Sequence, residues 1–451
     1  MSASTKTPRL FGTDGVRGRA GEGWLTTEKA ALLARAIGEE LGANMGAERR
    51  ALVGHDGRRS GPELEKAVAD GLKSAGFGVV SAGLIPTPGL AVIAKNDGFD
   101  LAVMLSASHN PAEDNGIKVF GGADGKLSDE EEDRIEARVR ADQRAVPESS
   151  GPRHDETIGE QYLNLLINRT PSLSLVGKTI AIDCANGAGS EIGPELLRRL
   201  GARVIQIGCA PDGSNINQGV GSTHPEALQA AVVKHEASLG IALDGDGDRC
   251  LLIDENGELV DGDGIMAICG LALARSGELP SNRLVATVMS NKGLAKALRT
   301  DDVTMQITGV GDRRVVEALR AGGYGLGGEQ SGHIVFGEAH DYVGDGLYTA
   351  LRVLAILEES KTTLSRAASV FTAFPQVLIN VPVKSKPPFE TLGEVAQHVE
   401  NLERELGDDG RVLLRYSGTE SLARVMVEGP DLAMIQREAE AIGAEIAKLI
   451  G

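Results

Sequence analysis

Three stretches of this chain repeat one order of elements, and this repeat constrains the fold more than any other feature of the sequence. In each stretch an apolar strand runs into a loop rich in Gly, Asp, Asn or Ser, and an amphipathic helix and a second apolar strand follow. A glycine precedes the second strand in the first two stretches. The stretches comprise residues 51–84, 179–209 and 284–310. Alternation of strands and helices predicts βαβ units around a largely parallel sheet. We therefore expect three related α/β domains in series.

The end of the chain departs from this repeat. The pattern there predicts a helix, a strand at 412–416, a glycine turn, a strand at 422–429 and a long helix, which together form a smaller α+β domain. The length of 451 residues suggests about three domains at roughly 150 residues each. A polar linker is expected at 145–160. We place the domains at residues 1–150, 151–256, 257–372 and 373–451.

The charge balance limits the partners that the chain can have. It carries 64 acidic and 46 basic side chains, a formal net charge of −18, which argues against nucleic acid or an anionic membrane as the main partner. A few local Arg and Lys side chains can still bind a small anion. No apolar run approaches the roughly 20 residues of a membrane span, and the N-terminal segment lacks the apolar core of a secretory signal. We expect a cytoplasmic protein with a small-molecule partner.

The strongest local signal is ALDGDGDRCLLID, residues 242–254. Asp244, Asp246 and Asp248 alternate with two glycines directly after an apolar stretch. Three carboxylates this close repel one another unless a cation neutralises them, and hard oxygen ligands suit Mg²⁺. An EF-hand is excluded because Arg249 occupies the sixth position, where glycine is needed. The alternative is a solvated turn.

A second segment, MLSASHNPAEDNGIKVF, follows another apolar strand. Asn110 as N-cap, with Pro111 and Glu113 after it, predicts a short helical turn. The free N–H groups of such a helix start favour negative charge just upstream, so Ser108 is a candidate to carry a phosphoryl group. The alternative is an ordinary capped turn, and the metal site predicted elsewhere in the chain favours the phosphoryl role.

A third segment, GLGGEQSGHIVF, is a glycine-rich bend at residues 325–336. It holds three polar side chains, those of Glu329, Ser331 and His333. These groups are suited to the recognition of hydroxyls. A tight turn without a ligand is the alternative.

A fourth segment, LLRYSGTESLARVMVEG, places two strands around a small turn. Its polar or flexible residues are Arg415, Ser417, Gly418, Thr419 and Arg424. Backbone N–H groups, two hydroxyls and two guanidinium groups form a suitable cradle for a phosphate dianion. A plain hairpin turn is the alternative.

A fifth segment, RLFGTDGVRGRAG, lies near the N-terminus at residues 9–21. Arg17 and Arg19 occupy a glycine-rich stretch that suits a position near a phosphate. Alone, this pattern is a weak indication of function.

Five motifs from these segments occur in order between residues 11 and 420: FGTDGVRG, SASHNP, DGDGDR, GEQSGH and RYSGTE. The set resembles the α-D-phosphohexomutase superfamily, and most closely its bacterial phosphoglucosamine mutase branch, of which FGTDGVRG, GEQSGH and VGDR (310–313) are typical. One position departs from the family pattern. Ser421 stands where the family commonly has proline after SGTE, which implies a looser phosphate loop without the loss of a binding group.

The resemblance implies a role for each segment. The expected catalytic residues are Ser108, Lys118, Arg17, His109 and Arg249. Ser108 would carry the phosphoryl group in the resting enzyme, and Lys118 would act as general acid or base. The ligands of one Mg²⁺ would be an oxygen on Ser108 and the carboxylates of Asp244, Asp246 and Asp248.

Substrate-binding residues follow from the same resemblance. The sugar hydroxyls would be held by Glu329, Ser331 and His333, and the distal phosphate by Arg415, Ser417, Gly418, Thr419 and Arg424. The implied fold has three related α/β domains with mixed, mostly parallel sheets and a smaller C-terminal α+β domain around a central cleft. The implied reaction interconverts glucosamine 6-phosphate and glucosamine 1-phosphate through a bisphosphorylated sugar.

Three alternatives stay open at this point. The same chemistry on mannose or glucose phosphates would keep every motif. A metal-dependent sugar phosphatase would form phosphorylated Ser108 and let water finish the reaction, although the second phosphate-binding segment speaks against it. An inactive sugar-phosphate sensor is a third alternative. We expect a monomer or a homodimer.

Overall fold

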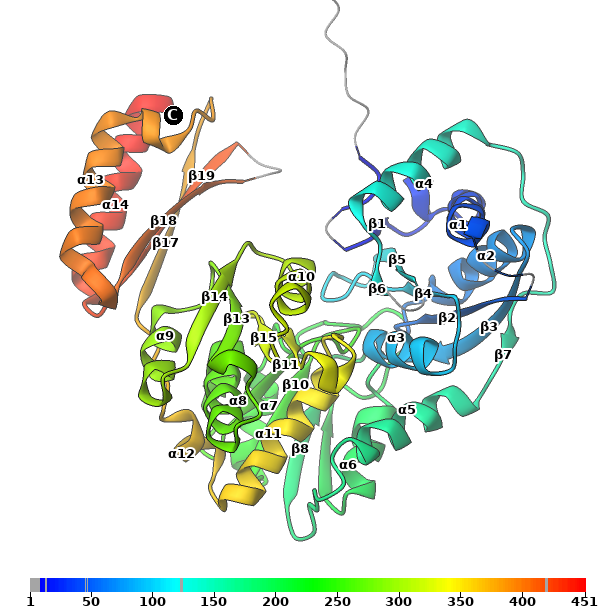
Figure 1. Cartoon of the computed structure of the whole chain (residues 1–451), viewed down its shortest axis with the longest axis horizontal. Coiled ribbons are helices and arrows are strands. Elements are labelled where there is room, and N and C mark those ends of the chain that lie inside the picture. Colours follow the sequence, from blue (N-terminus) through cyan, green and yellow to red (C-terminus); the bar gives the residue numbers. More distant parts are fainter. Residues whose placement is uncertain (1–8, 13, 45, 47, 122–124, 418–420) are drawn as a thin grey trace, which may run out of the picture.

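The computed structural model describes residues 9–12, 14–44, 46, 48–121, 125–417 and 421–451. Four domains follow one another along the chain, three of them α/β domains and the last a smaller domain with an antiparallel sheet (Figure 1). This is the predicted fold class. Within the described residues, none of the helices combines the length and apolarity that a membrane crossing requires.

The first α/β domain is built on a mixed sheet with the strand order β1-β5-β4-β2-β3-β7, and β6 pairs with β5. The predicted unit at 51–84 is observed as β2, α2 and β3, with the two strands parallel. The elements are β1 (Val16–Arg19), α1 (Thr27–Leu41), β2 (Arg49–His55), α2 (Gly61–Ser74), β3 (Phe77–Leu84), α3 (Thr87–Asn96), β4 (Leu101–Leu105), β5 (Asp114–Gly121), β6 (Gly125–Lys126), α4 (Asp129–Ala141) and β7 (Arg153–His154).

The second domain has the sheet order β12-β11-β10-β8-β9. The predicted unit at 179–209 forms β8, α6 and β9, again with parallel strands. The elements are α5 (Thr157–Asn168), β8 (Thr179–Asp183), α6 (Ile192–Arg199), β9 (Arg203–Ile207), α7 (Glu226–Lys234), β10 (Leu239–Leu243), β11 (Cys250–Ile253) and β12 (Leu259–Val260).

The third domain has the sheet order β14-β13-β15-β16. The predicted unit at 284–310 forms β13, α9 and β14, also parallel. The elements are α8 (Gly262–Ser276), β13 (Arg283–Thr287), α9 (Lys292–Leu298), β14 (Thr304–Thr308), α10 (Asp312–Gly322), β15 (Gly327–Gly328), β16 (Ile334–Val335), α11 (Gly346–Ser360) and α12 (Leu364–Ala368).

One loop occupies the same topological position in each of these three domains. The strand before the loop is parallel to the first strand of the βαβ unit. The strand after the loop pairs antiparallel with the strand before it. The three loops join β4 to β5, β10 to β11 and β15 to β16, and they contain the motifs SASHNP, DGDGDR and EQSGH. The repeated topology therefore places all three motifs at corresponding sheet edges.

The C-terminal domain is a three-stranded antiparallel sheet, β17-β19-β18, covered by two helices (Figure 1). The elements are β17 (Gln376–Pro382), α13 (Gly393–Leu406), β18 (Arg411–Tyr416), β19 (Leu422–Glu428) and α14 (Leu432–Ile450). The order from α13 to α14 is the predicted one. Strand β17 was not predicted, because its Pro-rich end resembles a linker more than a strand.

Side-chain caps explain where several helices begin. Ser128 accepts from the N–H of Glu131 and Glu131 accepts from the N–H of Ser128, a capping box at the start of α4. The carboxylates of Asp261, Asp345 and Asp431 cap α8, α11 and α14 in the same way. Each cap satisfies N–H groups that the first turn of a helix leaves without partners.

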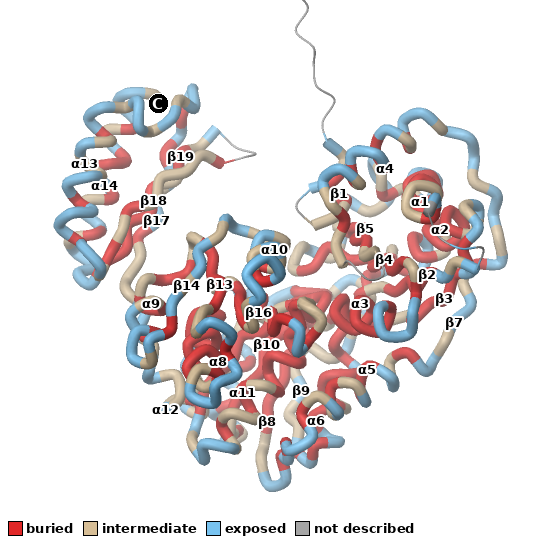
Figure 2. Tube along the Cα trace, in the orientation of Figure 1, coloured by how far each residue is buried: buried red, intermediate tan, exposed pale blue. Residues whose placement is uncertain are grey.

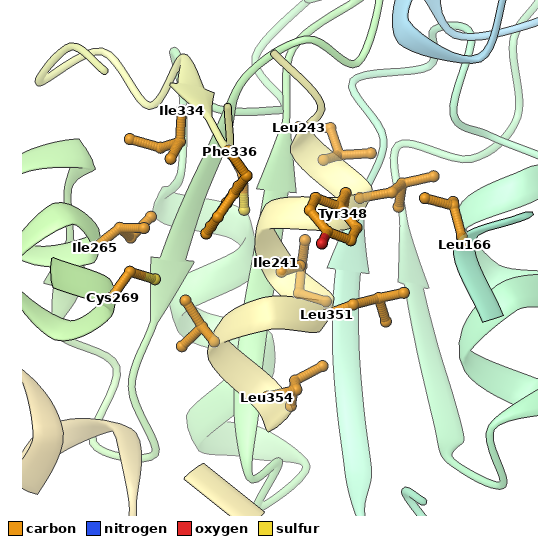
Figure 3. Close-up of a cluster of buried hydrophobic side chains, with 14 of the residues drawn as sticks. Leu166, Ile241, Leu243, Ile265, Cys269, Ile334, Phe336, Tyr348, Leu351 and Leu354 are labelled. Atoms are coloured by element: carbon orange, nitrogen blue, oxygen red, sulfur yellow. The ribbon is translucent and has the colours of Figure 1, made fainter. Parts of the chain in front are cut away.

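One hydrophobic core runs through all three α/β domains, and separate clusters lie beside it within each domain. It includes Leu52 from the first domain, Ile241 from the second and Leu284 from the third. Helix α11 lies in the middle of this core, where Tyr348 and Leu351 face the side chains of β10 (Figure 3). Because one core crosses the domain borders, the three domains form one packed body.

The C-terminal domain has a separate core. Val395 of α13, Val425 of β19, and Ile435 and Ile442 of α14 are fully buried within it. Figure 2 shows buried positions in α13, α14 and the sheet of this domain, apart from the buried positions of the other domains. The domain thus has the means to hold its own shape.

Candidate active site

The three aspartates predicted to bind a metal are brought together by the loop after β10. The ligand oxygens of Asp244, Asp246 and Asp248 all lie within 4.8 Å of one another, and all three side chains are buried. Gly245 permits this approach, because a Cβ there would lie 2.6 Å from the carbonyl oxygen of Ser108. The carboxylates thus converge beside the serine loop of the first domain.

The donor set of this cluster fits a hard divalent cation. Within the described part of the chain, Asp246 Oδ1 and Asp248 Oδ1 are buried without a hydrogen-bond partner. Burial, and then repulsion from Asp248 and Asp246, raises the pKa of Asp244 well above its usual value. A bound cation would relieve both the repulsion and the missing hydrogen bonds, because oxygen ligands of this kind suit Mg²⁺ or a similar ion. The residues therefore fit a metal.

The side chain of Ser108, in the first domain, lies beside the three carboxylates. Its Oγ lies 2.7 Å from Asp244 Oδ2 and 3.2 Å from His109 Nδ1. Its backbone has a φ of 53°, in the left-handed region that a serine seldom adopts. Such strain persists only where surrounding contacts hold it, and it often marks a functional position. The side chain is also buried.

The helical turn predicted from Asn110 is wrong. The segment forms turns that lead directly into β5. Arg58 is the physical reason, since its guanidinium group donates to the carbonyl oxygens of Ser108 and Asn110 at 2.9 Å each and of Asp114 at 2.9 Å. Asn217 donates to the first two of these carbonyls as well. The carbonyl groups therefore bind side-chain donors instead of the N–H groups of a helix.

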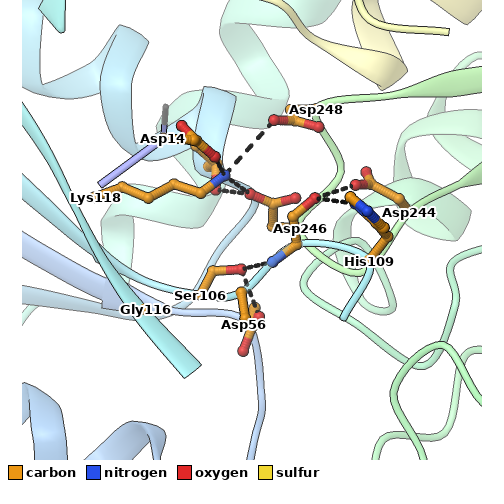
Figure 4. Close-up of polar contacts among 12 residues, drawn as sticks. Asp14, Asp56, Ser106, His109, Gly116, Lys118, Asp244, Asp246 and Asp248 are labelled. Atoms are coloured by element: carbon orange, nitrogen blue, oxygen red, sulfur yellow. Dashed lines mark hydrogen bonds and ion pairs between the residues drawn. The ribbon is translucent and has the colours of Figure 1, made fainter. Parts of the chain in front are cut away.

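A buried scaffold behind Ser108 was missed by the sequence analysis. Asp56 accepts from Ser106 Oγ at 2.6 Å and from Arg58 Nε at 2.9 Å, and Ser106 Oγ accepts from the Ser108 N–H at 2.8 Å (Figure 4). Asp56 and Arg58 belong to the loop after β2, and β2 is the parallel neighbour of β4. The carboxyl ends of parallel strands share one sheet edge, so the sequence HDGRRS at residues 55–60 was an available signal.

Lys118 projects from β5 into the metal cluster. Its Nζ lies 2.7 Å from Asp246 Oδ2, 2.8 Å from Asp14 Oδ2 and 3.7 Å from Asp248 Oδ2 (Figure 4). Burial lowers the pKa of Lys118, but the carboxylates of Asp14, Asp246 and Asp248 outweigh it and raise the pKa well above its usual value. Lys118 is therefore a cation in this arrangement. Asp14 was not assigned a role from the sequence.

The metal loop is also fixed by the starts of two helices. Thr87, the first residue of α3, donates its hydroxyl to Asp246 Oδ2 at 2.6 Å and its N–H to the Asp246 carbonyl at 2.9 Å. Gly346, the first residue of α11, donates its N–H to the carbonyl of Gly247 at 3.0 Å. The first and third domains thus hold the loop of the second domain between them.

A cavity of about 420 Å³ opens in front of these groups. The predicted site residues that line it are Arg17, Ser108, His109, Asp248, Arg249, Glu329 and His333. Burial, and then the charges of Arg249 and Arg17, lowers the pKa of His109, so that its imidazole is neutral near pH 7. The cavity offers basic groups for a phosphate beside the serine hydroxyl.

The sugar-binding segment contributes two of its three predicted residues to this cavity. Glu329 lines it, and its Oε1 accepts from the Gly311 N–H at 3.0 Å. The ring of His333 is buried with its Nδ1 3.8 Å from Asp248 Oδ2. Burial lowers the pKa of His333, but Asp248 and Asp312 outweigh it and raise the pKa. Ser331 is exposed on the turn and does not line the cavity.

The predicted distal phosphate site lies in the C-terminal domain. Arg415 on β18 is directly opposite Arg424 on β19, and Ser417 follows β18. Two cations opposite each other on antiparallel strands repel, so an anion between them would be stabilising. Gly418 and Thr419 lie outside the described residues. In Figure 1 the hairpin of β18 and β19 points toward the first domain, and Arg415, Ser417 and Arg424 do not line the 420 Å³ cavity.

Models of one protein family match the chain from end to end. They describe the phosphoglucomutase/phosphomannomutase alpha/beta/alpha domains I, II and III and the C-terminal domain. They match residues 8–145, 160–257, 261–374 and 378–445 in this order.

Curated relatives are similar over nearly the whole length. A phosphoglucosamine mutase of Symbiobacterium thermophilum is 48% identical over 98% of this chain and 99% of its own. A phosphoglucosamine mutase of Nocardia farcinica is 47% identical over the same shares. Both therefore align with the chain across every segment described above.

Solved structures share the fold at lower identity. A phosphoglucomutase/phosphomannomutase family protein from Burkholderia thailandensis has a TM-score of 0.79 at 24% identity and covers 98% of both chains. The N-acetylphosphoglucosamine mutase of Aspergillus fumigatus, solved with GlcNAc-6P and magnesium, has a TM-score of 0.67 at 18% identity over 99% of this chain and 97% of its own. At these identities the likeness supports the four-domain architecture alone.

Proposed function

The chain belongs to the phosphoglucomutase/phosphomannomutase family, and on that premise we propose that it interconverts glucosamine 6-phosphate and glucosamine 1-phosphate. The proposed route passes through a phosphorylated Ser108 and a bisphosphorylated sugar. The amino sugar is favoured over mannose or glucose because the full-length relatives at 47–48% identity are phosphoglucosamine mutases.

One observation carries the chemical part of this proposal. The hydroxyl of Ser108 lies 2.7 Å from Asp244, within a buried group of three carboxylates and at the wall of a cavity lined with basic side chains. A surface turn without a function does not explain a strained serine beside three buried carboxylates. A site that carries a phosphoryl group next to a metal explains the strained serine, the carboxylates and the basic cavity wall.

The metal ligands in this proposal are Asp244, Asp246, Asp248 and an oxygen on phosphorylated Ser108. Mg²⁺ held there would neutralise negative charge that develops on the transferred phosphoryl group. Arg17 and Arg249 would add positive charge from the cavity wall.

The transfer step conserves atoms and charge as follows. The bond between phosphorus and Ser108 Oγ breaks while a bond forms between phosphorus and the free hydroxyl oxygen of the sugar. The hydroxyl proton passes to a base, a role for which the neutral imidazole of His109 is available, and Ser108 Oγ takes up a proton as the phosphoryl group leaves it. Lys118, held protonated by its carboxylate partners, is proposed as the general acid that supplies this proton. The reverse transfer from the other phosphate restores phosphorylated Ser108.

The second phosphate needs its own site, since the sugar carries two phosphates in the intermediate. Arg415, Ser417, Gly418, Thr419 and Arg424 are proposed to hold it. Arg415 and Arg424 lie directly opposite each other on β18 and β19, so two guanidinium groups come from one place on the sheet, which supports an anion there. A phosphatase has no need for such a site.

Turnover of metal-loaded, phosphorylated protein tests the proposal. We expect faster conversion of glucosamine 6-phosphate than of glucose or mannose 6-phosphate at equal concentrations, and no conversion by Ser108→Ala. Equal or better use of the other two sugars would move the chain to the phosphomannomutase or phosphoglucomutase activity of its family. Release of free phosphate at the rate of sugar consumption would indicate a phosphatase instead.

Several finer points stay predictions. We propose a cytoplasmic enzyme, active as a monomer or homodimer, with domain limits near residues 150, 256 and 372. Ser331 is proposed to reach the sugar only when substrate is bound, because it is exposed in this structure.

A further inference from the structure

Lys126 joins the first and third domains through two carboxylates. It is the last residue of β6, and its ammonium group donates to Asp14 Oδ1 at 2.6 Å and to Asp312 Oδ2. Asp14 precedes β1 in the first domain, and Asp312 is the first residue of α10 in the third. No role was assigned to these three side chains from the sequence motifs.

On the first-domain side, Asp14 links Lys126 to the metal cluster. The second oxygen of Asp14 accepts from Lys118 Nζ at 2.8 Å, and the same Nζ donates to Asp246 Oδ2 at 2.7 Å. Asp14 therefore lies between two lysines and sets the position of the ammonium group that enters the catalytic centre.

On the third-domain side, the contacts continue to the sugar-binding loop. Asp312 follows Gly311, whose N–H donates to Glu329 Oε1 at 3.0 Å. Movement of the start of α10 would therefore move the carboxylate that is proposed to bind the sugar hydroxyls. Lys126 joins this helix start to the first domain beside Arg313, whose guanidinium group donates to Asp129 of α4 at 2.8 Å; of the two, only Lys126 also contacts Asp14.

The four side chains Lys118, Asp14, Lys126 and Asp312 alternate in charge, and each stays ionised. Burial lowers the pKa of Lys126, but the carboxylates of Asp14 and Asp312 outweigh it and raise the pKa above its usual value. Burial raises the pKa of Asp14, yet Lys118, Lys126 and Arg17 together hold it well below its usual value. Removal of one charge would leave its neighbours without their partner.

Lys126 does not line the proposed substrate cavity. It lines a neighbouring cavity of about 430 Å³, and the two cavities share a wall of Asp248, Asp312 and His333. Lys126 lies outside the proposed substrate cavity, so any effect of Lys126 on the reaction must pass through the residues that it contacts.

We infer that Lys126 is a positioning residue for the proposed phosphoryl transfer. It fixes the sugar-binding loop of the third domain relative to Asp14 and, through Asp14, directs Lys118 toward the metal cluster. This inference rests on the proposed function. It applies equally to any hexose phosphate that the chain interconverts, because Lys126 does not line the cavity proposed for the sugar.

The test compares Lys126→Met with Lys126→Arg in the full-length, metal-loaded enzyme. We expect Lys126→Met to lower kcat about 100-fold, since a displacement of roughly 1 Å at reacting groups has that effect, while KM changes about threefold or less. Lys126→Arg keeps the cation and should recover at least a tenth of the wild-type kcat.

A matched control is Lys178→Met. Lys178 also forms an ion pair between domains, 2.7 Å from Glu358 of α11, but it lies away from the cavity. Its kcat should stay at the wild-type value. Thermal unfolding of every variant, with assays well below the transition, separates loss of folded protein from loss of turnover.

Coupling gives the second measurement. If Lys126 acts through Asp312, then Lys126→Met combined with Asp312→Asn should lower kcat hardly more than the stronger single variant. Multiplied losses in the double variant, a kcat of Lys126→Met near the wild-type value, or a loss in KM alone would each overturn the inference.

All variants are assayed with the sugar phosphate that the wild type converts fastest. The identity of that sugar tests the proposed function, whereas the ratio of variant to wild type tests Lys126. A wild type that prefers glucose 6-phosphate, together with a large kcat loss in Lys126→Met, would refute the proposed substrate and support the inference.

Discussion

The body formed by the three α/β domains and the C-terminal domain differ in how they are held in place. Apolar side chains such as Leu52, Ile241 and Leu284 belong to one core that crosses the borders inside the body. The C-terminal domain has its own core and meets the body mainly through polar contacts. Its Arg411 donates to the carbonyls of Val288 and Ser290 at 2.7 Å each.

The same joint contains further hydrogen bonds. The side chain of Asn291 donates to the Phe374 carbonyl at 3.0 Å and accepts from the Phe374 N–H at 2.9 Å. Glu428 of β19, fully buried, accepts from the N–H of Lys292 at the start of α9 in the body at 2.5 Å, and from Arg411 of its own domain at 2.9 Å. At the surface of the joint, Lys296 pairs with Asp409 at 3.3 Å.

This difference suits the two parts to different tasks. Polar interfaces between domains permit relative motion, whereas a shared apolar core resists it. Ser108, the three aspartates and Lys118 all lie in the body, where their distances are fixed. The proposed binding site of the second phosphate lies in the C-terminal domain, which can move. Such motion suits the proposed reaction, because its bisphosphorylated intermediate must turn around within the site.

The largest expected effect separates the two parts by their kinetics. Asp246→Asn in the body removes a charge that faces the metal and Lys118, and we expect kcat to fall about 100- to 1000-fold. Arg415→Met in the C-terminal domain should mainly raise KM for the sugar phosphate, because it weakens binding in all states. Steady-state kinetics and a Mg²⁺ titration measure both. Asp301→Asn, which affects a surface pair with Arg275, is the control.

If Asp246→Asn and Arg415→Met changed kcat and KM in the same proportions, the two parts would not have separate roles. The assignment of the chemical step to the body and of phosphate binding to the C-terminal domain would then be wrong.

Two matched core substitutions test whether the parts unfold separately. Leu351→Ala in α11 and Ile442→Ala in α14 each remove a fully or almost fully buried side chain. Each should lower the free energy of unfolding of its own part by about 2–5 kcal/mol. Hydrogen exchange resolved by residue should show faster exchange in all three α/β domains for the first variant, and in the C-terminal domain alone for the second. Uniform acceleration in both variants would mean one cooperative unit.

A smaller effect is expected at the joint. Arg411→Met removes the hydrogen bonds to Val288, Ser290 and Glu428, which should weaken the attachment of the C-terminal domain by about 2–3 kcal/mol. Arg404→Met is the matched control, since Arg404 pairs with Glu400 on the exposed side of α13. Small-angle scattering should show a broader distribution of domain separations for Arg411→Met alone. An unchanged scattering profile in the Arg411 variant would argue that the cores, not the polar joint, hold the domains.

A pH dependence of stability is also expected at the same joint. Burial first, and then repulsion from Asp261 and Glu428, raises the pKa of Asp263 to about 7, although the Asn291 N–H donates to its carboxylate at 2.7 Å. The unfolded chain has a pKa near 4 for this group, so the folded state binds the proton more tightly. Its stabilising contribution is complete below about pH 4 and is lost as the pH rises through 7, by at most about 1.4 kcal/mol per pH unit.

Denaturant unfolding of wild type and Asp263→Asn between pH 4 and 8 measures this term. The amide cannot ionise, so the variant should show a flatter pH profile than the wild type over this range. Parallel profiles for the two proteins would show that Asp263 does not titrate during unfolding.

Much of the fold followed from local patterns. Each predicted βαβ unit was observed, because an apolar run of strand length followed by an amphipathic helix and a second apolar run leaves few other ways to bury the apolar side chains. The helical turn after Ser108 failed for a nonlocal reason. Arg58 and Asn217, distant in sequence, supply donors to the carbonyls that a helix would have used.

The candidate site shows the same division. Asp244, Asp246 and Asp248 are neighbours in the chain, so the sequence by itself indicated a metal cluster. Asp14 and Asp312 lie within the motifs FGTDGVRG and VGDR, but no local pattern links them to each other or to Lys126. Only the tertiary structure brought Lys126 between them and Asp14 beside Lys118, because charge contacts act over a few ångströms in space regardless of separation along the chain.

The sequence by itself thus determined the strand and helix order and the chemistry of each loop, since both depend on residues close together in the chain. The tertiary structure decided which loops meet, which carboxylates hold Lys118 and how the C-terminal domain is attached. Those outcomes depend on the burial of apolar surface between segments far apart in sequence, and that burial is settled only when the whole chain packs.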